Sequence, residues 1–316
     1  MKKVITAAVI FIALGAVAFV GALAFSGWDF EMLSTENYVT NEYTISESFK
    51  NITVIDNTAD VTLLPSSEGE VKVVCYEDEN EKHTVFTEND TLFIKKVKNK
   101  KWYQYIGISF KSPKVTVYIP EGEYERLSVE LDTGDLSIHE GFIFESVKLE
   151  SDTGEVDFAA TVRGRAEIET DTGKVTFSGS AKSLDISCET GNITLTPNAT
   201  LGDIELDVDT GKISLSSVRC ESLKIESDTG SVTLRDVIAT GNFGIETDTG
   251  KVTFDACDAA NITVKTDTGD VRGTLLSKMH FIAKSRTGDV NVPETVSEKT
   301  CRINSSTGDI KISIAE

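Results

Sequence analysis

The tripeptide Asp-Thr-Gly, or a close variant of it, recurs ten times between Asp132 and the C-terminus, and successive copies lie 18 to 20 residues apart. A fixed period of this length is typical of proteins built from stacked structural repeats. Asp-Thr-Gly is also the aspartic-protease signature, but such an enzyme brings two loops together so that two carboxylates share one proton. Ten evenly spaced copies instead predict a turn that is used once per repeat, and no catalytic residues.

The turn residues form two sets at fixed positions in the repeat. The glycines are Gly134, Gly154, Gly173, Gly191, Gly211, Gly230, Gly250, Gly269, Gly288 and Gly308. The aspartates two positions earlier are Asp132, Asp152, Asp171, Asp209, Asp228, Asp248 and Asp267, and Glu189, Arg286 and Ser306 occupy this position in the other copies. Stacking would place these side chains in a column with a spacing of about 4.8 Å.

Two interpretations of this acidic column are open. Glycine- and aspartate-rich solenoids can hold Ca²⁺ between their coils. Here each turn offers a single carboxylate, and a lysine follows the glycine in several copies, as Lys174, Lys212 and Lys251 do. We therefore favour a solvated column of structural turns, and we expect no metal and no other cofactor.

The residues around each glycine alternate between apolar and polar side chains. The second residue after every glycine is aliphatic, from Leu136 in the first copy to Ile310 in the last, and an apolar residue also precedes each glycine by five positions. Two such alternating runs predict two short strands per repeat. The chain is thus expected to be all-β, a single-stranded parallel β-solenoid (β-helix) of about 19–20 residues per coil. Right-handed coiling is the default for parallel crossovers.

The N-terminus carries an apolar run of 22 residues from Val4 to Phe25, directly after Lys2 and Lys3. Its length and flanking charges predict one transmembrane helix with the N-terminus inside the cell. The alternative is a cleaved signal peptide with Ala22-Leu23-Ala24 as its cleavage motif. Either interpretation places the solenoid outside the cytoplasm, and the first makes the chain a single-pass protein of a bacterial cell membrane.

These patterns divide the chain into four parts. Residues 1–28 are the membrane anchor or signal peptide, 29–48 a stalk, 49–126 irregular early coils with a cap, and 127–316 the regular repeats. Within the third part Ala59 stands where a worn repeat would have its glycine. Divergent end repeats are expected, because an unprotected end exposes strand edges.

Composition excludes some classes of function. The formal net charge of −20 is spread through the repeats, whereas a nucleic-acid-binding protein needs a basic face. The five cysteines are an odd number for disulfide pairing, and we interpret them as small buried hydrophobic residues. The three histidines, His83, His139 and His280, are scattered without metal-ligand spacing.

One basic patch interrupts the acidic background. Its residues are Lys95, Lys96, Lys98, Lys100 and Lys101, followed by Trp102 and Tyr103. It could contact anionic lipid headgroups or an acidic wall polymer, with the aromatic rings at the interface. It could equally be a long loop with packed aromatic rings and solvated lysines.

Several of these motifs together resemble the putative-adhesin family of domains of unknown function found in bacterial envelope proteins, including LiaG-like proteins. The resemblance rests on the N-terminal apolar segment, the run 115–120 (Val-Thr-Val-Tyr-Ile-Pro) with 124–127 after it, and turns such as 268–271 (Thr-Gly-Asp-Val). It covers about residues 45–316 and implies a β-solenoid with a surface role. It supplies no catalytic residues.

The sequence therefore favours a non-enzymatic adhesion, scaffold or envelope-stress module outside the cytoplasm. Its expected partners are the membrane, an envelope protein or wall polymer, and a second copy bound end to end through the final coil, residues 307–314. The alternative is a polysaccharide-binding or polysaccharide-cleaving β-helix. Such enzymes build their sites on long loops, and a repeat length of 18 to 20 leaves no room for them after Gly134.

Overall fold

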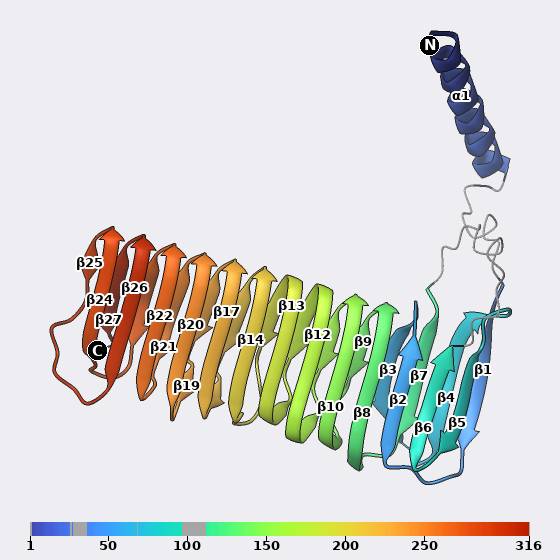
Figure 1. The fold of residues 1–316 in the computed structure, drawn as a ribbon. Helices are drawn as coiled ribbons and strands as arrows, with labels where there is room; N and C mark the ends of the chain where they lie inside the picture. Colours follow the sequence, from blue (N-terminus) through green and yellow to red (C-terminus); the bar gives the residue numbers. More distant parts are fainter. Residues whose placement is uncertain (1, 26, 28–36, 68, 97–111, 316) are drawn as a thin grey trace.

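The computed structural model describes residues 2–25, 27, 37–67, 69–96 and 112–315. Within these ranges, one helix is followed by strands that wind into a long solenoid (Figure 1). Nearly all strands belong to one continuous hydrogen-bonded sheet. The all-β solenoid predicted from the repeats is therefore confirmed.

Helix α1 (Lys2–Phe25) covers the apolar run at the N-terminus. Within the described residues, no helix combines the length and the apolar character that crossing a bilayer requires. The prediction of a helix is thus confirmed, but its assignment as a transmembrane span is not supported.

Each coil contributes one strand to each of two main faces. The first face runs through β2 (Asn51–Asp56), β8 (Gly122–Thr133), β10 (Phe142–Thr153), β12 (Thr161–Phe177), β13 (Ser180–Leu195), β14 (Asp203–Thr210), β17 (Ser222–Thr229), β20 (Asn242–Thr249), β22 (Asn261–Thr268), β26 (Thr300–Thr307) and β24 (His280–Thr287). All of these neighbours pair in parallel, which confirms the predicted strand direction.

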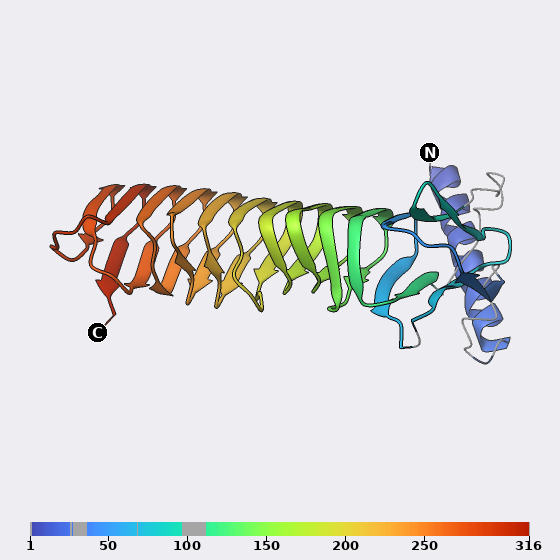
Figure 2. The same cartoon turned by 90° about the horizontal axis from the view of Figure 1, so that it is seen from below.

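The second face lies opposite the first (Figure 2). It runs through β3 (Asp60–Pro65), β9 (Leu136–Ile138), β11 (Val156–Phe158), the ends of β12 and β13, β15 (Ile213–Ser216), β18 (Val232–Arg235), β21 (Val252–Cys257), β23 (Val271–Leu275), β27 (Ile310–Ile314) and β25 (Val290–Asn291). A small third pairing joins β16 (Arg219–Cys220) to β19 (Ile238–Ala239).

The core lies between the two faces and consists of columns of like side chains. Val232 pairs in register with Ile213 on one side and Val252 on the other, and all three are at most 1% exposed. Phe158 and Phe177 stack with ring centroids 5.3 Å apart. One coil cannot bury its apolar face alone, so stacking supplies the core that each repeat lacks.

At the N-terminal end the order of coils in space differs from their order in the chain. The coil of β2 and β3 packs against β8 and β9, while the later strands β6 (Thr91–Lys96) and β7 (Lys114–Ile119) lie outside it. Antiparallel strands then extend both faces: β5 (His83–Glu88) pairs with β6, and β4 (Val71–Asp78) joins β7 to β1 (Tyr38–Ile45). These strands form a cap at this end of the solenoid.

The C-terminal end shows the same exchange of order. Strand β26 lies between β22 and β24, and β27 lies between β23 and β25 (Figure 1). The last coil of the chain is therefore inserted into the stack, and the preceding coil, 280–292, lies at the end. The prediction that residues 307–314 form the exposed end is wrong, because consecutive coils have equivalent core positions and the final coil inserts one place inward.

Candidate functional site

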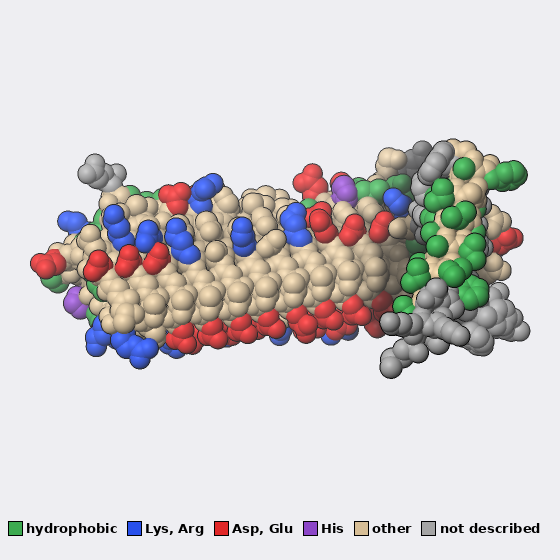
Figure 3. All heavy atoms as spheres, turned by 90° about the horizontal axis from the view of Figure 1, so that it is seen from above, with side chains coloured by type: hydrophobic (Ala, Val, Ile, Leu, Met, Phe, Trp, Pro, Cys, Tyr) green, Lys and Arg blue, Asp and Glu red, His purple; other side chains and the backbone are tan. Residues whose placement is uncertain are grey.

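The turn residues form an exposed acidic ribbon along one edge of the solenoid. Parallel register aligns the turns of neighbouring coils, as in the pairing of Thr153 with Thr133 and Thr172. Carboxylates at eight successive coils, from Asp132 to Asp267, are solvent-exposed. Rows of acidic side chains are visible along the rod in Figure 3. In space, Asp267 is followed by Ser306 and then Arg286, so the ribbon ends in a basic residue.

The ribbon tolerates its own charge because it faces water. Unit charges at this spacing repel by about 1 kcal/mol in water. Burial, followed by the charges of Glu226, Asp209 and Asp228, raises the pKa of Asp207 beside the ribbon. Lysines on the neighbouring strands partly offset this repulsion, as in the pairing of Lys224 with Glu205 at 2.7 Å.

The glycines are required chiefly because successive turns approach very closely. A Cβ atom added to Gly230 would lie 1.6 Å from the carbonyl oxygen of Gly211, and one added to Gly250 would lie 1.6 Å from that of Gly230. A positive φ is found at Gly134 and Gly154, for example, but not at Gly230 or Gly250. The expectation that turn glycines serve through a positive φ is therefore wrong for Gly230 and Gly250, which are required because the neighbouring turn lies so close.

Backbone hydrogen bonds hold the glycine column together. The N–H of Gly230 donates to the carbonyl oxygen of Thr249 at 2.9 Å, and that of Gly250 donates to Thr268 at 2.9 Å. Similar bonds link the turns of most neighbouring coils. The column thus continues the strand ladder through the turn and makes this edge of the rod rigid.

A second polar column lies inside the same edge, three residues before each glycine, and sequence reasoning missed it. Its buried members are Leu131, Ser151, Thr170, Cys188, Val208, Ser227, Thr247, Thr266 and Ser305. Several of these hydroxyls, such as that of Thr247, have no protein hydrogen-bond partner. Leu131 and Val208 show that this position also accepts apolar side chains, so Cys188 fits among the serines and threonines.

The basic patch lies mostly outside the described residues, since Lys98, Lys100, Lys101, Trp102 and Tyr103 belong to the range 97–111. Lys95 lies over the ring of Phe93, with its Nζ 4.4 Å from the centroid. The Nζ of Lys96 donates to Thr58 Oγ1 at 2.7 Å, and its side chain is only 9% exposed. Lys96 is therefore unavailable for the predicted surface contact, because it is held inside the cap.

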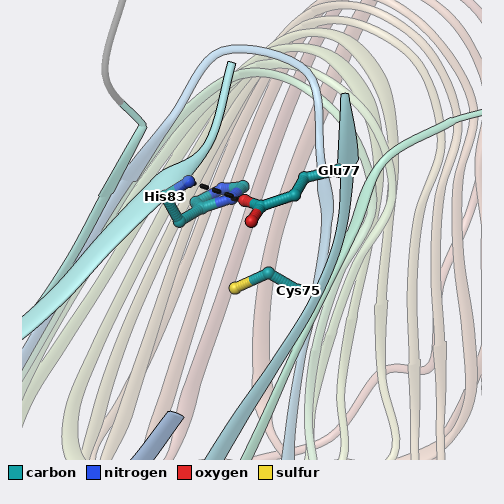
Figure 4. A group of neighbouring side chains, drawn as sticks. All are labelled: Cys75, Glu77 and His83. Atoms are coloured by element: carbon teal, nitrogen blue, oxygen red, sulfur yellow. Dashed lines mark hydrogen bonds and ion pairs between the residues drawn. The ribbon is translucent and has the colours of Figure 1, made fainter. Parts of the chain in front are cut away.

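The cap also encloses a cluster of ionisable side chains that the sequence did not predict. Cys75 and Glu77 lie two residues apart on β4, so they face the same side of the strand. His83 begins β5 and Asp56 ends β2. The four side chains meet between the two faces, and all four residues are at most 3% exposed. Figure 4 shows three of them.

The imidazole of His83 bridges two carboxylates. Its Nδ1 is 2.5 Å from Glu77 Oε2, and its Nε2 is 2.5 Å from Asp56 Oδ2. The backbone N–H of His83 also donates to Glu77 Oε2, at 2.6 Å. Burial by itself would lower the pKa of His83, but its hydrogen bonds to Asp56, Cys75 and Glu77 outweigh burial and raise this pKa to about 11.

Both carboxylates are held by further donors. Asp56 Oδ1 accepts the backbone N–H groups of Thr58 and Ala59 at 2.6 and 2.7 Å. Glu77 Oε1 accepts Asn41 Nδ2 at 2.5 Å. Burial opposes ionisation of Asp56 and Glu77, yet the hydrogen bonds from His83 hold the pKa of each below its ordinary value. The cluster thus joins the two faces of the cap through ionised, hydrogen-bonded groups.

No signal in the sequence identified this cluster, because its residues come from three strands of the irregular segment. The spacing of Cys75, Glu77 and His83 matches no zinc motif, and Asp56 precedes Cys75 by a whole coil. The other cysteines are buried and free, as is Cys75, which confirms their prediction as unpaired buried residues.

Comparison with known proteins places the chain in a family. The family model for Toastrack DUF4097 matches residues 49–199, 180–242 and 195–316. These matches cover most of the chain, so it belongs to the Toastrack DUF4097 family. This result confirms the resemblance to a family of solenoid domains of unknown function.

Several solved structures are similar to the chain. They include a putative adhesin from Bacteroides fragilis, with 16% identity and a TM-score of 0.38, covering 89% of this chain and 99% of that one. A putative adhesin from Parabacteroides distasonis has 13% identity and a TM-score of 0.46, covering 89% and 98%. A putative lipid binding protein from the same species has 16% identity and a TM-score of 0.34, also covering 89% and 98%. No curated protein matches the chain.

Proposed function

We propose that this protein is a non-enzymatic scaffold or adhesion module that acts outside the cytoplasm, in the bacterial envelope. The observation that carries the proposal is the parallel in-register stacking of the coils, which repeats similar side chains along the rod. A rigid rod of this kind presents many equivalent contacts to one extended partner. Weak contacts of this kind can add up to firm attachment.

The surface of the rod supports binding rather than catalysis. The hollows along the ribbon are open and lined by side chains such as Glu246, Asp248 and Asp267. A hollow of about 430 Å³ lies in the cap and is lined in part by Glu42, Lys72 and Tyr118. The carboxylates of the ribbon lie on the open surface of the rod, where an extended partner can contact them.

The acidic surface also bears on the nature of the partner. A net charge of −20 repels acidic polysaccharides, so the polysaccharide-cleaving alternative has less support than attachment to a neutral or basic envelope component. The placement outside the cytoplasm rests on the apolar run 4–25 after Lys2 and Lys3. It remains part of the proposal.

Self-association is part of the same proposal, but it moves from the final coil to the coil at the end of the stack. Strand β24 pairs with β26 on one side, and a strand with an unpaired edge invites strand addition. Outside α1, the exposed large hydrophobic residues of the described chain are Leu276, Val290 and Val296, and all three lie near this end. We propose that a second copy covers them.

Retention on envelope material tests the attachment function. The full chain is mixed with purified membranes and with cell-wall sacculi, and the bound fraction is measured against salt concentration. A matched pair of variants locates the contact. One replaces Asp209, Asp228, Asp248 and Asp267 by Asn, and the other replaces the exposed Glu88, Asp90, Glu294 and Glu298 by the corresponding amides.

Retention that is weakened by the first variant and not by the second supports attachment through the ribbon. Release of soluble sugar from the sacculi, or no retention on either material, contradicts the proposal. Sedimentation across concentrations tests self-association. Val290→Lys with Val296→Lys is expected to abolish a concentration-dependent dimer, and a monomer at all concentrations excludes it.

A further inference from the structure

The cap holds three potential metal ligands in one enclosed position, independently of the ribbon. Cys75 Sγ, a carboxylate oxygen of Glu77 and a ring nitrogen of His83 all lie within 4.8 Å of one another. They come from β4 and β5, and Asp56 reaches the same place from β2. A sulfur, a nitrogen and an oxygen donor at such distances are the ligand types that zinc prefers.

The side chains of the cluster are arranged unequally around His83. Asp56 Oδ2 lies at Nε2, and the other oxygen of Asp56 is fixed by two backbone N–H groups. Glu77 lies at Nδ1, on the same strand and the same side as Cys75. A histidine that binds a metal through one ring nitrogen usually donates its other N–H to a carboxylate, which orients the ring. Asp56 is placed for that second role.

We propose that Cys75, Glu77 and His83 bind one zinc ion, with His83 coordinating through Nδ1 and Asp56 accepting the Nε2–H hydrogen bond. The ion takes the place of the proton between Nδ1 and Glu77 Oε2. With bonds of about 2.0–2.2 Å in a tetrahedral site, these two atoms must separate from 2.5 Å to about 3.4 Å. The backbone of β4 is fixed by its pairing with β7 and β1, so the separation must come from rotation of the Glu77 side chain.

The exchange is balanced in charge. Without metal, His83 is protonated between two ionised carboxylates and Cys75 is a thiol, so the formal charge of the cluster is −1. When Zn²⁺ binds, the imidazolium and the Cys75 thiol each release one proton, and the sum of two carboxylates, one thiolate and one divalent ion is again −1. Zinc therefore adds no net charge to this buried position, and no oxidant or reductant is needed.

The choice of metal follows from the donors. Calcium and magnesium take oxygen ligands, whereas a thiolate and an imidazole favour zinc and similar ions. Three protein ligands leave a fourth position for a water molecule or for the second oxygen of Glu77. Because the cluster connects β2 with β4 and β5, a bound ion would fasten the cap to the first coil of the solenoid.

The test uses the full chain, unfolded in denaturant with reductant and chelator and then refolded with either zinc or chelator, since a buried site fills during folding. Zinc per chain is measured after gel filtration. A parallel sample is refolded with Co²⁺, which gives a sulfur-to-cobalt charge-transfer band when a thiolate coordinates. The variants are Cys75→Ser, His83→Gln and Asp56→Asn. Cys188→Ser is the matched control, because Thr170 occupies the equivalent position in the adjacent coil and serine or threonine occupies it in several others.

The expected result is about one zinc per chain and a charge-transfer band for the wild type and Cys188→Ser. Cys75→Ser should lose the band, His83→Gln should lose the metal, and Asp56→Asn should weaken zinc binding by about 10- to 100-fold. No stoichiometric zinc in the refolded wild type, or no charge-transfer band with cobalt, overturns the proposal. Zinc binding that is unchanged in Cys75→Ser and His83→Gln also overturns the proposal, because the zinc would then be bound by surface carboxylates. The wild-type spectrum decides the question even if a variant fails to fold.

Discussion

The close approach of successive turns predicts a large difference between two glycines of the same coil. Gly244 lies within β20, and an added Cβ there meets no atom within 4 Å. Gly250 follows the same strand, and an added Cβ there lies 1.6 Å from the carbonyl oxygen of Gly230. Neither residue has a positive φ, so the comparison isolates steric overlap from backbone preference.

The magnitude follows from the distances. Real Cβ atoms stay at least 3.0 Å from such an atom, so Gly250→Ala requires a separation of 3.0 − 1.6 = 1.4 Å between neighbouring turns. The hydrogen bond from Gly230 N–H to Thr249, now 2.9 Å, cannot survive that shift. About two lost backbone hydrogen bonds at about 1 kcal/mol each and overpacking of about 1–3 kcal/mol give a destabilisation of about 3–5 kcal/mol. Gly244→Ala should be neutral or stabilise by up to about 1 kcal/mol.

The assay is thermal unfolding of the full chain, followed by far-UV circular dichroism. For a chain of this size about 1 kcal/mol corresponds to 2–4 °C, so Gly250→Ala should lower the melting temperature by about 10 °C and Gly244→Ala should leave it within about 3 °C. Because a stack of repeats can unfold in parts, an unfolding curve of Gly250→Ala that splits into two transitions would also agree with the close-approach explanation. Equal melting curves for the two variants would refute the close-approach explanation.

Three further outcomes are expected. Ile213→Asp places an unpaired charge at a fully buried core position and should abolish the native circular dichroism spectrum. The control Lys212→Asp, at the exposed neighbouring residue, should retain that spectrum. A folded Ile213→Asp variant would contradict the conclusion that Ile213 faces the core. Burial raises the pKa of Cys220 and of Cys301 to about 12, so neither thiol should react with a thiol reagent at pH 8 until the chain unfolds, and rapid labelling of the native protein would argue against their burial. Because these thiols ionise at a lower pH in the unfolded chain, the free energy of unfolding should fall as the pH rises from about 9 towards 12. Strand β26 lies between β22 and β24, whereas β24 pairs with β26, so the amides of β26 should exchange with solvent more slowly than those of β24 in native-state hydrogen exchange. Faster exchange in β26 than in β24 would contradict the inserted coil.

The sequence predicted the repeating part of the fold well, because each coil repeats the same local pattern of apolar residues and a turn glycine. Alternation around Val232 or Ile213 fixes which side chains face inward, and a glycine in every turn marks where successive coils meet. Stacking is then the one way to bury these side chains. The prediction of buried cysteines without disulfides also came from the sequence, through their odd number.

The order of the end coils was decided by tertiary packing. A coil that carries Val271 can pair with the coil of Ile310 or with that of Val290, because both present an aliphatic residue at the same position. Local pattern cannot choose between them. The structure pairs Val271 with Ile310 and leaves Val290 43% exposed at the end, so the more apolar final coil receives the buried place.

The buried cluster in the cap likewise depends on tertiary structure. His83, Glu77 and Asp56 belong to different strands, and the exchange of coil order and the antiparallel additions bring them within hydrogen-bond distance. Contacts between residues distant in the chain can be predicted from the sequence only where those residues recur at a fixed spacing, as the turn residues do. The repeats were therefore readable from the chain alone, whereas the cap, where contacts join segments without a period, was determined by the three-dimensional packing of the two faces.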